Sequence, residues 1–354
     1  MSWQDKLRKV DPYIAGEQPR IQNLIKLNTN ENPYDPGEKV KEAIKQFDSS
    51  QLSLYPRPDA DELRKALAQY HHLDENQVFI GNGSDEVLAL IFLTCFNGKE
   101  PVLFPDISYS FYPVYCKLYQ IPYRQIPLND QFEIVYTDYY QPNSGIIFPN
   151  PNAPTGMCIS LEMIEDILKH NLESIVVIDE AYIDFGGQSA VSLIQKYPNL
   201  LITQTFSKYR SLAGIRLGVA LGSQEVIARL YDVKNSFNSY PIDRLAQVIG
   251  LASMEDSEYI QQNAQKIIET REYTKLELKK LGFVMPDSKA NFIFVKHPHY
   301  DAQKLFQQLR EKGILVRYFH QPRIEQYLRV TIGTQKQMEK LIDTVKKILN
   351  QEIG

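Results

Sequence analysis

The sequence is poor in cysteine, in long apolar runs and in excess charge of either sign. Its 354 residues include only three cysteines, at positions 95, 116 and 158, and their wide spacing matches neither a disulfide framework nor a zinc motif. The longest apolar run, residues 87–96, is interrupted by Thr94 and is too short for a bilayer, which needs about 20 residues. The net charge of −4 excludes a strongly basic surface for nucleic acid or for an anionic membrane.

The start of the chain, "MSWQDKLRKV", also lacks the apolar core of a signal peptide. Together with the cysteine usage, this absence favours a reducing compartment, so we expect a cytoplasmic protein. What the chain does contain is an ordinary globular composition, with 43% hydrophobic and 23% charged residues. Its length is sufficient for about two domains.

Short β-rich runs alternate with helical segments through the first two thirds of the chain. The runs are residues 78–81, 101–105, 145–150, 175–179, 200–206 and 216–222, and the helical candidates between them are 86–96, 108–118, 161–170 and 189–195. Continuous apolar strands separated by helices predict an α/β fold with a mostly parallel sheet covered by helices on both faces.

We divide the chain into three parts. Residues 1–40 are rich in Pro, Asn and charge and form an N-terminal arm, and residues 41–240 form the large domain with the parallel sheet. Residues 241–354 form a smaller α+β domain, because a long charged helix there precedes short strands, a further helix and a closing helix.

Polar side chains follow several of the predicted strands, where open parallel sheets bind their ligands. They are Ser84 and Asp85 after a glycine turn, Asn152 in "PNPNAPTG", Asp179 and Tyr182 in "VIDEAY", and Thr205, Ser207, Lys208 and Arg216 in "TFSKYRSLAGIRLG". Taken singly, each has a structural explanation, such as a helix cap, a turn former or a snorkelling lysine. The glycine turn lacks the third glycine of a dinucleotide fingerprint and the lysine of a P-loop.

The combination of these residues is what pyridoxal 5′-phosphate requires. A lysine amine forms a Schiff base with the cofactor aldehyde, and a carboxylate pairs with the protonated pyridine nitrogen. That cation should lower the pKa of the carboxyl. A helix N-terminus, hydroxyl groups and an arginine hold the phosphate. This chemistry requires no metal, and we expect none.

These motifs resemble, in order and spacing, those of the class II pyridoxal-phosphate aminotransferases of fold type I. The resemblance extends over nearly the whole chain through "DPYIAGEQP", "LNTNENP", "YPRPDADELRKALA" and "LRVTIGT". It implies a large cofactor domain, a small domain and a homodimer with shared sites. One departure is visible, because the position after the lysine is usually small and here is Tyr209, followed by Arg210.

The resemblance also implies a role for each site residue. Lys208 forms the Schiff base and moves the proton, Asp179 pairs with the pyridine nitrogen, and Asn152 and Tyr182 bind the ring hydroxyl oxygen. Tyr109 stacks on the ring. The cofactor phosphate is expected to be bound by Ser84, Asp85, Ser207, Arg216, Thr205 and, from the neighbouring subunit, Tyr55. Arg329 is expected to bind the anionic group of the substrate, with contacts from Asn152, Tyr13 and Tyr55.

The activity that the resemblance implies is transfer of the amino group of L-histidinol phosphate to 2-oxoglutarate, a step of histidine biosynthesis. An aromatic amino-acid aminotransferase and a threonine-phosphate decarboxylase share the core motifs and stay open as alternatives. A non-catalytic regulator with a transaminase-like domain is disfavoured, because the arm has no evident helix-turn-helix. A dinucleotide-dependent oxidoreductase is disfavoured by the incomplete glycine fingerprint.

Overall fold

A seven-stranded sheet forms the centre of the larger part of the molecule. The computed structural model describes residues 2–14, 16–19 and 23–351, so residues 1, 15 and 20–22 of the expected arm and 352–354 of the expected small domain lie outside the described residues. The strand order is β2-β8-β7-β6-β5-β3-β4. The bounds are β2 Val78–Asn82, β3 Val102–Pro105, β4 Tyr123–Ile126, β5 Gly145–Pro149, β6 Val176–Asp179, β7 Leu200–Thr205 and β8 Leu217–Gly222.

The sheet is mostly parallel, as the continuous apolar runs predict. Strands β4, β3, β5, β6 and β7 pair in parallel, whereas β8 pairs antiparallel with both β7 and β2. Parallel neighbours need a crossover between them, and the helices that make these crossovers cover the sheet. The carboxyl ends of β5, β6 and β7 therefore lie at one edge of the sheet, as a ligand site of this fold requires.

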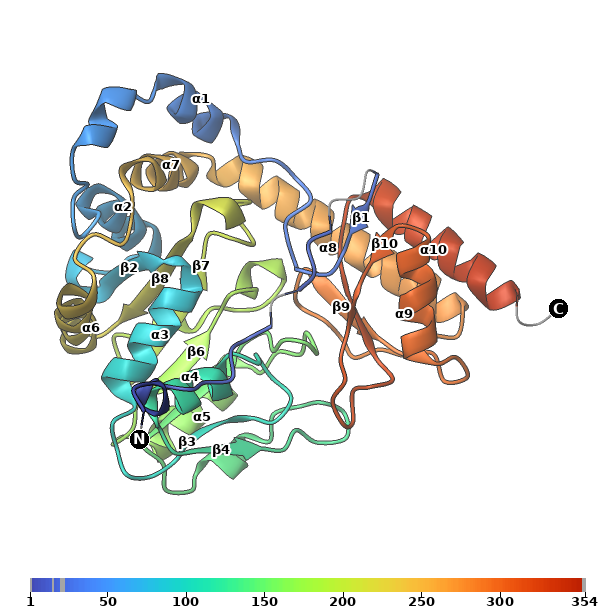
Figure 1. The fold of residues 1–354 in the computed structure, drawn as a ribbon, viewed down its shortest axis with the longest axis horizontal. Helices are drawn as coiled ribbons and strands as arrows, with labels where there is room; N and C mark the ends of the chain where they lie inside the picture. The colour runs from blue at the N-terminus through green and yellow to red at the C-terminus, as the bar shows by residue number, and fades with distance from the viewer. Residues whose placement is uncertain (1, 15, 20–22, 352–354) are drawn as a thin grey trace.

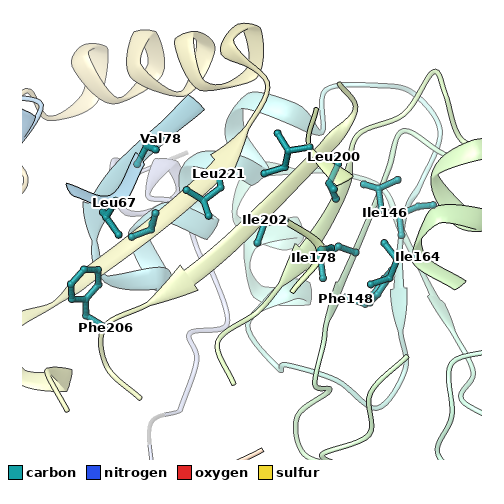
Figure 2. Packing of buried hydrophobic residues seen from close by; sticks show 14 of the residues in the cluster. Leu67, Val78, Ile146, Phe148, Ile164, Ile178, Leu200, Ile202, Phe206 and Leu221 are labelled. Carbon is teal, nitrogen blue, oxygen red and sulfur yellow. The ribbon is translucent and has the colours of Figure 1, made fainter. Parts of the chain in front are cut away.

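Helices bury both faces of this sheet. On β6, Val176 and Ile178 belong to one apolar cluster, together with Leu67 of α2 and Ile164 of α5, and Figure 2 shows how closely members of this cluster pack. Val177 between them belongs to the opposite cluster, with side chains of α3, α4 and α6. The bounds are α1 Glu38–Gln46, α2 Asp61–His71, α3 Gly83–Cys95, α4 Tyr112–Tyr119, α5 Leu161–His170, α6 Gln224–Phe237 and α7 Arg244–Glu255.

The last third of the chain has its own core around a small antiparallel sheet. The order of this sheet is β11-β12-β9, and a separate pair joins β1 and β10 in parallel. The bounds are α8 Ser257–Lys280, β9 Phe292–Val295, α9 Ala302–Glu311, β10 Ile314–Leu315, β11 Arg317–Tyr318, β12 Leu328–Thr331, α10 Gln335–Asn350 and, from the N-terminal segment, β1 Ile25–Lys26. Figure 1 shows the two parts side by side, with α8 reaching from one to the other.

Some local expectations are wrong. Residues 189–195 do not form an α-helix but a short 3-10 helix, Ala190–Leu193. The run 314–319 is divided between β10 and β11, which join different sheets. The domain boundary at residue 240 stays a prediction, and α7 just beyond it packs against α2 in the core of the larger part. Among the described residues, no helix combines the length and the apolar character that crossing a bilayer demands.

Candidate active site

A cavity of about 830 Å³ lies at the carboxyl ends of β5, β6 and β7, where β11, β12 and the N-terminal segment close it from the other side. The topology brings together residues from widely separated parts of the sequence. Of the expected site residues, the cavity is lined by Tyr13, Ser84, Asp85, Tyr109, Asp179, Tyr182, Thr205, Ser207, Lys208, Arg216 and Arg329. The parallel order of the strands aligns their carboxyl ends and brings Asp179 and Lys208 to the same edge of the sheet, whereas Tyr13 and Arg329 come from the N-terminal segment and the small sheet.

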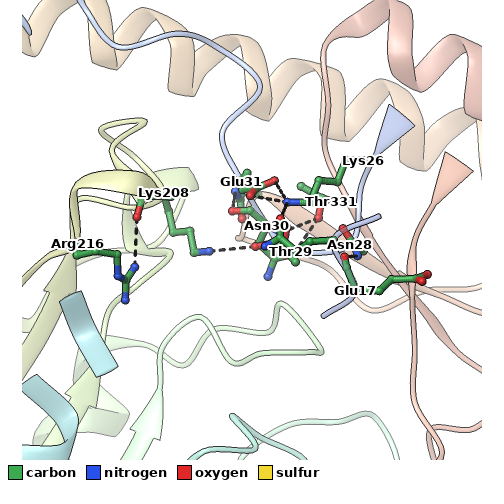
Figure 3. Close-up of polar contacts among 12 residues, drawn as sticks. Glu17, Lys26, Asn28, Thr29, Asn30, Glu31, Lys208, Arg216 and Thr331 are labelled. Carbon is green, nitrogen blue, oxygen red and sulfur yellow. Dashed lines mark hydrogen bonds and ion pairs between the residues drawn. The ribbon is translucent and has the colours of Figure 1, made fainter. Parts of the chain in front are cut away.

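Lys208 lines this cavity. The residue follows the end of β7, and its Nζ donates a hydrogen bond to the backbone oxygen of Thr29 at 3.1 Å, as Figure 3 shows. Burial, and secondarily the positive charge of Arg329, lowers the pKa of Lys208 to about 8. A large fraction of the amine is therefore neutral near pH 8, and a neutral amine is the form that attacks carbonyl carbon.

Asp179 ends β6 beneath the cavity and is only 5% exposed. Its carboxylate accepts hydrogen bonds from the hydroxyl of Tyr112 at 3.0 Å, from the hydroxyl of Thr203 at 3.2 Å and from the backbone N–H of Ala181 at 3.3 Å. Burial nevertheless raises the pKa of Asp179 to about 6, because these hydrogen bonds only partly offset the loss of solvent. Such a carboxylate is stabilised strongly by any cation placed beside it.

The N-terminus of α3 and Arg216 form one end of the cavity. Helix α3 begins at Gly83, whose φ of +76° favours glycine, and a Cβ there would clash with Nη2 of Arg216. Nη2 of Arg216 also lies 3.0 Å from Oδ2 of Asp85, and the hydroxyl of Tyr109 donates to Oδ1 of the same carboxylate. Ser84 lines the cavity beside them. A helix N-terminus with an adjacent arginine is suited to a phosphate group.

Two arginines form the opposite end of the cavity. Arg329 on β12 and Arg317 on β11 are direct cross-strand partners, and both line the cavity. Arg329 donates from Nη2 to the backbone oxygen of Asn28 at 2.9 Å, and its buried Nε has no protein partner. Burial and the charge of Arg317 lower the pKa of Arg329. Two cations on directly paired positions of neighbouring strands favour a doubly charged anion.

Arg317 was not among the expected site residues. The available signal was an arginine after an apolar run in "ILVRYF", the same pattern that marks Arg329 in "YLRVT". The pattern alone cannot indicate a site, because the pairing of the two strands decides which cation is next to which.

The segment 28–32, "NTNEN", also contributes more than the sequence indicated. Thr29 accepts the hydrogen bond from Lys208, and Nδ2 of Asn32 donates to the backbone oxygen of Lys208 at 2.9 Å. Nδ2 of Asn30 donates to the hydroxyl oxygen of Tyr182 at 3.0 Å. The sequence showed this segment only as part of the resemblance, since its partners lie roughly 150 to 300 positions further along the chain.

Two expected site residues do not line the cavity. Asn152 is buried, and its amide donates to the backbone oxygen of Ile107 and to the hydroxyl of Thr155, while its Oδ1 has no protein partner. Tyr55 is 79% exposed and stacks on Tyr240 with ring centroids 4.8 Å apart. A surface position is compatible with a contact to a second subunit, and the roles of both residues stay predictions.

Tyr13 and Tyr209 line two different cavities. The ring of Tyr13 stacks on Phe111 at 4.3 Å and lines the main cavity. Tyr209 and Arg210 instead line a separate cavity of about 20 Å³ behind β7, large enough for about one water molecule. The unusual side chain after Lys208 therefore turns away from the space that a substrate would occupy.

The cavity thus contains the amine of Lys208, whose pKa is lowered, and the buried carboxylate of Asp179. Its two ends are both suited to anions. Among the described residues there is no group of His, Cys, Asp and Glu that could hold a metal ion. The arrangement can form a covalent bond from Lys208 to a carbonyl carbon and can bind a molecule with an anionic group at each end.

Known proteins are similar to this chain in sequence and in fold. The model of the family described as aminotransferase class I and II matches residues 22–345. The chain is 60% identical to the histidinol-phosphate aminotransferase of Lactococcus lactis subsp. cremoris strain SK11, with 99% of each chain covered. The fold is similar to the histidinol-phosphate aminotransferase of Clostridium acetobutylicum, with a TM-score of 0.85, 26% identity and 93% and 100% of the two chains covered. It is also similar to that of Sinorhizobium meliloti in complex with pyridoxal-5′-phosphate, with a TM-score of 0.83, 21% identity and coverage of 92% and 91%.

Proposed function

The chain belongs to the aminotransferase class I and II family, and from this premise we propose that it transfers the amino group of L-histidinol phosphate to 2-oxoglutarate. The products are imidazole-acetol phosphate and L-glutamate, and the reaction belongs to histidine biosynthesis. The observation that carries the proposal is the position of Lys208 between a phosphate-binding helix end and the Arg317–Arg329 pair. One end suits the cofactor phosphate and the other suits the phosphate of the substrate.

The residues present fit pyridoxal 5′-phosphate as the cofactor. When bound, this group supplies an aldehyde that links covalently to amines and a ring that accepts electrons from the bond being broken. Lys208 offers an amine for that link, and the buried carboxylate of Asp179 offers a partner for a protonated ring nitrogen. The α3 N-terminus with Arg216 offers a site for the phosphate, to which Ser207 and Thr205 add hydroxyl groups from the wall of the same cavity.

Around the ring we assign further positions to the chain's own residues. Tyr182 would donate its hydroxyl hydrogen to the ring hydroxyl oxygen, and Tyr109 would cover one face of the ring. Asn152 is assigned to the same ring oxygen as Tyr182, although its amide hydrogens contact Ile107 and Thr155 in the protein alone.

The arginine pair selects the substrate. A phosphate monoester carries close to two negative charges at neutral pH, and Arg317 with Arg329 supplies two positive charges on neighbouring strands. In the second half of the reaction, Arg329 binds the carboxylate of glutamate or 2-oxoglutarate. One cationic site thus serves two substrates of different shape.

Lys208 moves the proton. Its amine would take the proton from the substrate carbon that carries the amino group, so this amine must be neutral at the start. The pKa of about 8 makes the neutral amine accessible at slightly alkaline pH. The carboxylate of Asp179 would pair with the protonated ring nitrogen while this proton moves.

We further propose a homodimer in the cytoplasm, with Tyr55 of each subunit reaching the cofactor phosphate of the other. Exposed apolar side chains in the two segments that the stack of Tyr55 on Tyr240 joins support the dimer: Leu52, Leu54, Tyr55, Phe237 and Tyr240 are between 45% and 79% exposed. Apolar side chains gathered at a surface indicate an interaction site.

A single half-reaction tests the function. The protein is loaded with pyridoxal 5′-phosphate, L-histidinol phosphate is added alone, and the visible absorption of the bound cofactor is followed. We expect the band to move to the near ultraviolet and to return when 2-oxoglutarate is added, whereas Lys208→Ala should show neither change. A band that responds only to phenylalanine or tyrosine would make the protein an aromatic aminotransferase, and release of CO₂ from threonine phosphate would make it a decarboxylase.

A further inference from the structure

Asn30 lies at the centre of a buried hydrogen-bond network that joins the small antiparallel sheet to Tyr182. Its side chain is 1% exposed, and that of Thr331 on β12 is 2% exposed. The backbone N–H of Asn30 donates to the hydroxyl oxygen of Thr331 at 3.0 Å, and that hydroxyl donates to Oδ1 of Asn30 at 3.0 Å. Nδ2 of Asn291 donates to the backbone oxygen of Asn30 at 3.1 Å. These bonds fix both the main chain and the side chain of Asn30.

The network also decides which way the amide of Asn30 faces. The hydroxyl of Thr331 has one hydrogen, and Oδ1 of Asn30 is the acceptor that receives it. If the amide were turned over, Thr331 would accept two hydrogen bonds, and its own hydrogen would lose this acceptor. The orientation that satisfies Thr331 therefore directs Nδ2 of Asn30 at the hydroxyl oxygen of Tyr182, 3.0 Å away.

Because Asn30 donates, Tyr182 cannot use its hydrogen on Asn30. A phenol has one hydrogen, and an amide nitrogen does not accept it. Burial raises the pKa of Tyr182, so the phenol keeps this hydrogen at neutral pH. Tyr182 lines the cavity, and its hydroxyl hydrogen is thus free for a ligand that enters there.

The backbone conformation at position 30 also favours asparagine. Its φ is +56°, in the left-handed region, which asparagine and aspartate tolerate better than other residues with a Cβ. A residue held in this region by several side-chain bonds is typical of functional sites. Asparagine therefore satisfies the backbone, the hydroxyl of Thr331 and the phenol of Tyr182 together.

We propose that Asn30 is a positioning residue: by donating to the phenol oxygen of Tyr182, it directs the phenol hydrogen toward the ring hydroxyl oxygen of the cofactor. The proposal rests on the function given above. Its consequence is that the segment "NTNEN" and β12 hold Tyr182, the proposed hydrogen-bond partner of the cofactor, in place.

The test is a pH titration of the visible absorption of the protein loaded with pyridoxal 5′-phosphate. Asn30→Asp keeps the size, the backbone preference and the acceptor for Thr331, but it replaces the donor that faces Tyr182 by an acceptor. The phenol hydrogen then turns to the new carboxylate, and the ring oxygen loses a donor. We expect the pH midpoint of the absorption change to rise by about one unit. A shift of this size corresponds to the loss of one hydrogen bond to a charged group.

A double-variant comparison separates this effect from the added charge. The titratable groups that act on Tyr182 are Lys208, Arg329, Asp179, Tyr13 and Tyr109, and a new carboxylate among them could shift the midpoint by itself. Tyr182→Phe removes the hydroxyl, so Asn30→Asp should add no further shift in that background. A shift of equal size with and without the hydroxyl, or an unchanged midpoint in Asn30→Asp, would overturn the proposal.

Two further variants keep the test decisive. Thr331→Val retains Asn30 but removes the hydroxyl that orients its amide, so a smaller upward shift is expected even if Asn30→Asp does not fold, and an unmoved midpoint counts against the proposal. Asn199→Asp changes a buried amide whose donors face Asn171 and Ser174, and it should leave the midpoint in place. A wild-type protein that binds no cofactor overturns the proposed function, whereas unmoved midpoints in an active enzyme overturn only this inference.

Discussion

Replacing Asp179 by asparagine should stabilise the cofactor-free protein at pH 8 while removing most of the activity of the loaded enzyme. The carboxylate is buried among neutral partners, and the proposed cation of the cofactor ring is what would compensate its charge. Without that cation the ionised form is disfavoured, and a neutral side chain of the same size avoids the problem. With the cofactor bound, the same substitution removes the partner of the ring nitrogen.

The magnitude follows from the pKa of Asp179. Burial raises it from the ordinary 3.8 to about 6, and each pKa unit corresponds to about 1.4 kcal/mol. Keeping the carboxylate ionised in the folded state therefore costs up to about 3 kcal/mol relative to the unfolded chain. Because the folded-state pKa is the higher one, this destabilisation is absent at pH below 3.8, grows as the pH rises toward 6 and is complete above it.

The substitution should preserve the local hydrogen bonds. Thr203 and Ala181 donate to Oδ1, which asparagine keeps. The hydroxyl of Tyr112 donates to Oδ2 in the native protein, and it can rotate to accept from an amide in the variant. The predicted gain is thus an electrostatic effect with little change in packing.

Urea unfolding followed by circular dichroism provides the assay. The midpoint of Asp179→Asn should exceed that of the wild type at pH 8, and the difference should be smaller at pH 5. Saturating pyridoxal 5′-phosphate should reverse the order, because ligand binding then stabilises the wild type more. Asp232→Asn, at a carboxylate that is 62% exposed, is the control. A variant that is less stable than the wild type by the same amount at both pH values would refute the reasoning.

Three other predictions follow from the site and the surface. Arg329→Ala should raise the KM for L-histidinol phosphate about ten- to a hundredfold, because it removes a charged hydrogen bond of about 1.5–3 kcal/mol; an unchanged KM in steady-state kinetics would contradict this role. Phe237→Glu should convert the proposed dimer to a monomer in sedimentation analysis, whereas Leu276→Glu on α8 should not, and a dimer that survives the first change would contradict the assigned interface. In the cofactor-free protein, labelling of Lys208 by an amine-reactive reagent, read by mass spectrometry, should be half-maximal near pH 8, since the pKa is lowered to about 8 from 10.5; a midpoint near 10 would exclude the lowered pKa.

Sequence patterns were sufficient for the parts of the fold that depend on local composition. The buried strands β5, β6 and β7 appear as continuous apolar runs because both of their faces are covered. The edge strand β4 was missed, since its middle residues Arg124 and Gln125 are exposed and polar. The antiparallel direction of β8 was also beyond local reasoning, because direction depends on which strands become neighbours.

The same distinction between local sequence and long-range pairing applies to the site residues. Lys208 and Asp179 were found because they lie at or just beyond the ends of buried strands that the parallel order brings together. Arg317 and Asn30 were missed, because each acquires its position from a partner on a distant strand, Arg329 in one case and Thr331 in the other. Register and long-range pairing are properties of the folded chain, and a single sequence does not reveal them.

The short parallel pair β1–β10 bears on how the protein is synthesised. Ile25 and Lys26 pair with Ile314 and Leu315, so a strand made at the start of translation has to wait for nearly the whole chain before its partner emerges from the ribosome. The segment 28–32 directly follows β1, and it is tied to β12 only after that. An unfinished chain can therefore fold its large sheet early, yet it cannot complete the pocket around Lys208. The Arg317–Arg329 end of the pocket is thus completed only in chains that have been synthesised almost to their end.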